Sequence, residues 1–116
     1  MKICRDEDVQ DEAVDIKGAK NVRMAVLIGP GDGAPNFYTR RFRLAPGGCT
    51  PMHTHDWEHE VYVLAGSGKV SSGGNERELL PGLCAYIPAG EIHQFVNTGC
   101  EELKFLCMIP KTDGGK

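Results

Sequence analysis

The chain has 116 residues, a net charge of −3, 41% hydrophobic residues and 25% charged residues. This length suffices for one domain with a hydrophobic core, and the negative charge argues against a nucleic-acid partner, which usually selects a basic surface. The sequence has no apolar run of membrane-spanning length and no evident secretory signal, so we expect a cytoplasmic protein without membrane contact. Five cysteines without a C-x-x-C pair agree with that reducing compartment.

The N-terminal segment, residues 1–21, is rich in aspartate and glutamate over its first sixteen residues. We expect it to be solvated and partly irregular, with a short helix as one option over Asp8 to Val14. The folded domain is expected over residues 22–110, and a flexible tail over residues 111–116.

Glycine and proline interrupt the rest of the chain every eight to fifteen residues, between short runs of β-branched and aromatic residues. This pattern is typical of antiparallel strands in a sandwich or barrel. The predicted strands are Arg23 to Ile28, Phe37 to Leu44, Glu60 to Leu64, Lys69 to Ser71, Glu76 to Leu79, Cys84 to Ile87, His93 to Val96 and Leu103 to Ile109. A hairpin turn is predicted at Ser72 to Asn75, because glycine and asparagine tolerate positive φ. The chain is therefore expected to be all-β.

All four histidines of the chain fall in two short segments, at His53, His55, His59 and His93. On a strand these first three have the same parity, so their imidazoles can share one face unless a turn near Asp56 interrupts the register. A single histidine would more often be a satisfied or exposed side chain. Four in this pattern indicate one site for a divalent transition metal, since imidazole is a preferred ligand of such metals.

The histidines also belong to two motifs that resemble those of the cupin superfamily. The first reads Gly47-x5-His53-x-His55-x3-His59-x6-Gly66, and the second reads Gly82-x5-Pro88-x-Gly90-x2-His93-x3-Asn97. The resemblance implies a cupin double-stranded β-helix, a jelly-roll barrel.

One position departs from the cupin pattern, because His59 stands where cupins usually place a glutamate ligand. Glu60 is adjacent, but it lies five rather than six residues from Gly66 and on the opposite strand face. We therefore predict four histidine ligands, with three histidines and Glu60 as the alternative if a bulge shifts the strand.

With four histidines, the chain is similar to the small single-domain manganese-binding cupins of thermophilic bacteria. That resemblance implies one metal per chain, Mn(II) first among the candidates, in a homodimer. The ligand type alone also admits Fe, Cu, Ni or Zn.

Strand alternation predicts an apolar pocket beside the metal, lined by Arg40, Phe42, Phe95, Phe105, Cys107 and Ile109. Arg40 would be a charge on an apolar face, either an anchor for a carboxylate or enolate or a structural ion pair or rim residue. Cys107 is either a reactive thiol near the metal or, as for most buried cysteines, a packing residue.

The leading functional prediction is a metal-dependent oxidoreductase of the dioxygenase type, acting on a small, partly apolar molecule. The catalytic residues other than the metal ligands are not identified, although Glu58 and Glu60 are candidates for a general base. A redox-neutral cupin isomerase and a non-catalytic metal-bearing sensor or binding protein are the alternatives, and an inert structural zinc site is a third.

Overall fold

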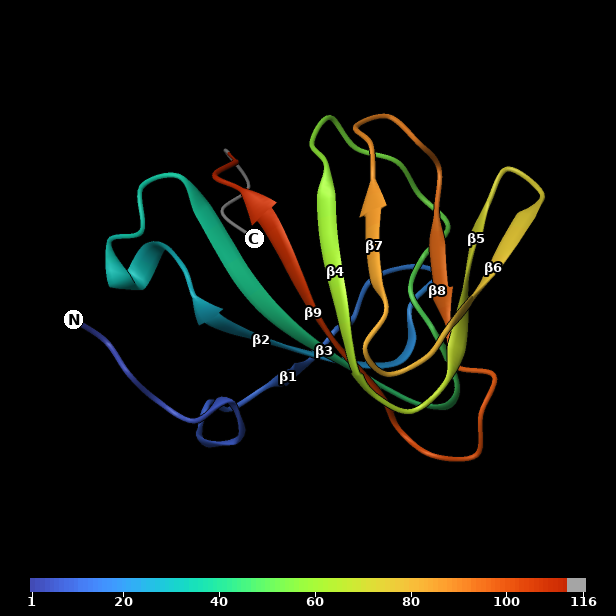
Figure 1. Ribbon diagram of the computed structural model, residues 1–116, viewed down its shortest axis with the longest axis horizontal. Helices are drawn as coiled ribbons and strands as arrows, with labels where there is room; N and C mark the ends of the chain where they lie inside the picture. Colours follow the sequence, from blue (N-terminus) through green and yellow to red (C-terminus); the bar gives the residue numbers. More distant parts are fainter. Residues whose placement is uncertain (113–116) are drawn as a thin grey trace.

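Nine strands make up almost all of the regular structure in the computed structural model, which describes residues 1–112 (Figure 1). The strands are β1 (Glu12–Ala13), β2 (Lys20–Ile28), β3 (Phe37–Cys49), β4 (His59–Ala65), β5 (Gly68–Ser72), β6 (Asn75–Leu79), β7 (Cys84–Ile87), β8 (Gln94–Val96) and β9 (Leu103–Pro110). All eight predicted strands are present, and the all-β prediction is confirmed. The end of the predicted flexible tail, residues 113–116, lies outside the described residues.

The strands form one curled antiparallel sheet in the order β6-β5-β8-β3-β9-β4-β7, with β2 on β3 and β1 on β2. In Figure 1 the long strands β3, β9 and β4 fan out on one side, and β5, β6 and β8 curl over on the other. The order brings the segment before β4 and the segment before β8 together, since His53 and His93 form an isolated antiparallel bridge. The two histidine segments therefore meet inside the curl.

Alternation of side chains explains the core. Every second residue of β9 is buried, and β4 buries His59, Val61 and Val63 while Glu60 and Tyr62 face solvent. The hairpin predicted at Ser72 to Asn75 is confirmed: Ser72 pairs with Asn75, and the two glycines between them have positive φ. No helix in residues 1–112 has both the length and the apolar character that a membrane crossing requires.

The N-terminal segment differs from its prediction. The helix considered over Asp8 to Val14 is wrong, because a short 3-10 turn over Asp6–Asp8 is followed by β1, which pairs with β2. Asp11 is not solvated either: its side chain is 8% exposed and lies 2.6 Å from Arg23 Nε and 2.8 Å from Arg43 Nη1. These cross-strand ion pairs hold the segment against the sheet.

Gly66, the last residue of the first motif, is predicted to tolerate no side chain. Its φ is +82°, and a Cβ there would overlap the backbone of Glu102 and Leu103. Gly66→Ala should therefore lower the free energy of unfolding by about 3 kcal/mol or more, as measured by urea denaturation. Gly82→Ala is the matched control, since Gly82 has a φ of +88° with no atom within 4 Å of its Cβ position. It should cost only the backbone strain, about 1 kcal/mol. Equal losses would contradict the overlap.

Candidate metal centre

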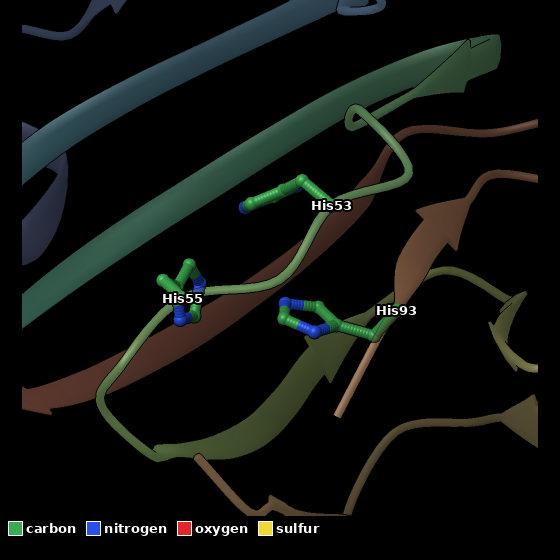
Figure 2. A group of neighbouring side chains, drawn as sticks. All are labelled: His53, His55 and His93. Atoms are coloured by element: carbon green, nitrogen blue, oxygen red, sulfur yellow. The ribbon is translucent and has the colours of Figure 1, made fainter. Parts of the chain in front are cut away.

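The four histidines reach the centre from three places in the fold. His53 and His55 lie in the loop between β3 and β4, His59 begins β4, and His93 immediately precedes β8. His53 N donates to His93 O at 3.1 Å, and His93 N donates back to His53 O at 3.0 Å. Figure 2 shows His53, His55 and His93 extending from these two segments toward one another. The bend at Asp56 does interrupt the strand, so His55 is positioned by the loop rather than by strand alternation.

The imidazole rings form one cluster. The centroids of five ring pairs among the four histidines lie 4.3 to 5.1 Å apart. His53, His55 and His93 offer ligand nitrogens that all lie within 4.8 Å of one another. His59 adjoins this group through His55, because their Nε2 atoms are 2.6 Å apart.

Three of the histidines use Nδ1 in the same way. His53 Nδ1 lies 2.8 Å from Pro51 O, His55 Nδ1 lies 3.1 Å from Trp57 O, and His93 Nδ1 lies 2.9 Å from Glu91 O. A carbonyl oxygen only accepts, so each Nδ1 carries the proton and each Nε2 keeps its lone pair for a metal ion. The backbone therefore sets the tautomer that metal binding requires.

His59 has a different partner. Its Nδ1 lies 2.9 Å from the Sγ atom of Cys107, which also accepts a hydrogen bond from Arg40 Nη2 at 3.0 Å. The sulfur thus links one histidine of the cluster to a buried cation. Burial raises the pKa of the Cys107 thiol, although the Arg40 charge acts in the opposite direction. Cys107 is the contact that orients the His59 ring.

Burial also favours the neutral form of three of these histidines. It lowers the pKa of His55 and His93, and it lowers the pKa of His59 to about 3 with further contributions from the charges of His55 and Arg40. Neutral imidazole is the form that binds a metal.

These features fit a divalent transition metal. The Nε2 atoms of His55 and His59 are 2.6 Å apart and therefore need a proton or a cation between them, because two lone pairs at that distance repel each other. The group of His53, His55 and His93 could hold a metal ion, with His59 as the predicted fourth ligand. Glu60 is exposed on the outer face of β4 and pairs with Tyr86 and Met108, away from the rings.

A cavity of about 420 Å³ opens onto the histidine cluster. Such a volume is typical of small-molecule sites. Most of the lining is apolar, and no aspartate or glutamate of residues 1–112 contributes to it. Trp57 forms part of the wall and stacks on the His55 ring with the ring centroids 4.4 Å apart. The site is therefore an apolar chamber with imidazoles at one end.

The pocket residues predicted from the sequence are mostly found in this lining. Arg40, Phe42, Phe95, Phe105 and Cys107 line the cavity. Ile109 does not: it is buried farther along β9, opposite Tyr38, where the alternation continues beyond the end of the cavity.

The sequence interpretation missed one wall of the cavity. The additional apolar residues are Val14, Ile16, Val22 and Met24, from the N-terminal segment and β2. Val14 N donates to Val22 O at 2.9 Å, which continues the pairing of β1 with β2 and brings the segment over the cavity. The sequence does contain a sign of this wall: Val14 and Ile16 are apolar residues at alternate positions within an otherwise acidic stretch.

The comparisons with known proteins agree with this architecture. The family model described as a cupin domain matches residues 40–109, more than half of the chain. The chain belongs to the cupin family, as the two motifs predicted.

Among solved structures, the polyketide cyclase RemF from Streptomyces resistomycificus is 39% identical and superposes with a TM-score of 0.91, covering 97% of this chain and 80% of that one. A predicted oxalate decarboxylase from Thermotoga maritima is 28% identical with a TM-score of 0.82, covering 94% and 98%. An oxalate-binding protein of Thermotoga maritima is 34% identical over 70 residues, 60% of this chain and 58% of its own length. The chain thus spans less than two thirds of the first curated relatives it matches.

Proposed function

We propose that this protein is a metal-dependent cupin enzyme that cyclises a small, partly apolar polycarbonyl compound without oxidation. The observation that carries the proposal is the chamber itself, a histidine cluster in the wall of a mostly apolar cavity that no carboxylate of residues 1–112 lines. The likeness to a polyketide cyclase over 97% of this chain supports the same class of reaction.

The reaction we propose is an intramolecular aldol condensation. A carbon next to one carbonyl loses a proton and attacks a second carbonyl carbon, whose oxygen takes up a proton. The resulting hydroxyl then leaves as water with a second hydrogen of the attacking carbon, so that no oxidant or reductant is consumed. Glu58 and Glu60 line a different cavity, so the proposal assigns the general base to neither of them. A divalent metal, when bound, supplies a Lewis acid that stabilises the negative charge developing on the carbonyl oxygen.

The residues of this chain would confine and orient the substrate. Phe42, Trp57, Phe95 and Phe105 offer flat apolar surfaces on the cavity wall, and Phe42 stacks on Phe105 with a centroid distance of 5.4 Å. Such walls would hold an extended chain folded on itself and exclude water from the reactive carbons.

The oxidoreductase expected from the sequence is the second candidate. It is favoured by the ligand chemistry: neutral imidazoles leave the charge of a divalent metal uncompensated, which favours the reduced ion and an anionic substrate.

Mn(II), the homodimer and the cytoplasmic location also stay part of the proposal. The cytoplasmic location is supported by the five cysteines, which are all free, as expected in a reducing compartment. The homodimer is supported by Tyr62 and Tyr86, which are exposed on β4 and β7, where a second subunit could cover them.

One assay separates the two candidates. Protein loaded with Mn(II), Zn(II) or Fe(II) is incubated with a short linear poly-β-ketone thioester, with and without oxygen, and the products are analysed by mass spectrometry. We expect a product lighter by one water molecule in both atmospheres, formed at least about 100-fold faster than with the His93→Ala variant. A product that contains added oxygen and forms only in air would favour the dioxygenase instead.

A further inference from the structure

Arg40 is a buried cation inside the chamber. It projects from β3, is 8% exposed, and its guanidinium carbon lies 5.0 Å from the centroid of the Phe42 ring. The one hydrogen bond of its side chain within residues 1–112 runs from Nη2 to Cys107 Sγ, and its Nε has no partner there. A neutral thiol is only a weak hydrogen-bond acceptor.

The neighbouring arginines of β3, unlike Arg40, have acidic partners. Arg41, on the opposite face, is held by the carbonyl of Val9 at 3.0 Å and by Asp11 at 3.5 Å. Arg43 pairs with Asp11 at 2.8 Å and with Glu102 at 3.0 Å. The acidic partners are therefore on the outer face of the sheet, and none of the ion pairs in the described part of the chain includes Arg40.

An unpaired buried charge is costly, because it loses hydration that nothing in the protein replaces. Among residues 1–112 no carboxylate lines the chamber, so the charge of Arg40 is left for an anionic ligand in the same cavity to compensate. The structural ion pair considered from the sequence finds no acid in the cavity lining among residues 1–112, and the rim position disagrees with the burial of the side chain.

We propose that Arg40 holds the anionic oxygen of the ligand, and that the chamber selects flat apolar molecules bearing a carboxylate or enolate. The guanidinium supplies charged donors for that oxygen, and the aromatic wall takes the rest of the molecule. The inference rests on the proposed function only in taking this cavity as the substrate site.

Binding can be followed with Trp57, the single tryptophan of the chain, which lines the same cavity. Zinc-loaded protein is titrated with benzoate and with benzyl alcohol, which share a ring but differ in charge. Tryptophan fluorescence and calorimetry report both affinities, and elemental analysis confirms equal zinc in every variant.

Arg40→Gln should weaken benzoate binding by about tenfold or more and leave benzyl alcohol within about twofold. Arg77→Gln is the matched control, since Arg77 is exposed on β6 and loses the same charge outside the cavity. The melting temperature of Arg40→Gln should equal or exceed that of the unchanged protein, because an uncompensated buried charge is removed.

Benzoate affinity that survives Arg40→Gln, or equal affinity of the unchanged protein for both probes, would overturn the proposal. If Arg40→Gln does not fold, Arg40→Lys retains the charge and should still prefer benzoate over benzyl alcohol. These outcomes do not depend on turnover: failure to cyclise the thioester would reject the proposed function and leave the anion preference standing.

Discussion

His59→Ala is expected to lower the affinity of the protein for Zn(II) and Mn(II) by more than about 100-fold, a larger effect than loss of an outer-shell contact usually gives. His59 is 6% exposed, and its Nε2 lies 2.6 Å from that of His55. Removing the ring takes away one nitrogen ligand and leaves the predicted metal site with the three remaining histidines. The measurement is competition with a chromophoric chelator.

Glu60→Ala is the control for that experiment. Glu60 follows His59 directly but faces solvent on the outer side of β4, so metal affinity should stay within about twofold of the unchanged protein. A loss confined to Glu60→Ala would mean that the carboxylate is the fourth ligand. A site that keeps full affinity in both variants would consist of His53, His55 and His93 alone.

The second large effect is a loss of stability of the metal-free protein in mild acid. In the unfolded chain histidine titrates near 6.5, whereas burial lowers the pKa of His55 and His93 and lowers that of His59 to about 3. The unfolded chain therefore binds more protons below pH 6.5, so acidification favours unfolding. Each buried histidine contributes a slope of at most about 1.4 kcal/mol per pH unit between about pH 6.5 and pH 4.5.

Urea denaturation across that pH range tests the slope, with His59→Gln as the comparison. Glutamine does not titrate, so the variant should lose up to about 1.4 kcal/mol per pH unit of the dependence. The carboxylates do not affect this comparison, because those with a lowered pKa, Asp11, Asp32 and Glu76, are the same in both proteins. A slope that is unchanged by the substitution would show that His59 titrates normally in the folded protein.

The strands show how much of the fold the local sequence pattern predicts. The alternation of apolar and polar residues predicts the alternating burial in β4 and β9, including a buried His59 beside an exposed Glu60. This prediction succeeds because one face of each strand in a curled sheet packs on the core, so burial alternates along the strand whichever segments lie beside it. The helix considered over Asp8 to Val14 was wrong because pairing with β2 and the ion pairs of Asp11 outweighed local propensity.

By itself, the sequence determined the cupin family, the all-β class and the histidines that meet at the candidate metal centre, because motif spacing is a local property of the chain. Only the tertiary structure decided which other groups surround those histidines and complete the site. The carbonyls that set the histidine tautomers, the wall formed by Val14 and Ile16, and the absence of an acid beside Arg40 within residues 1–112 depend on how segments far apart in the chain pack. Such contacts follow from three-dimensional register, which no spacing along the chain encodes.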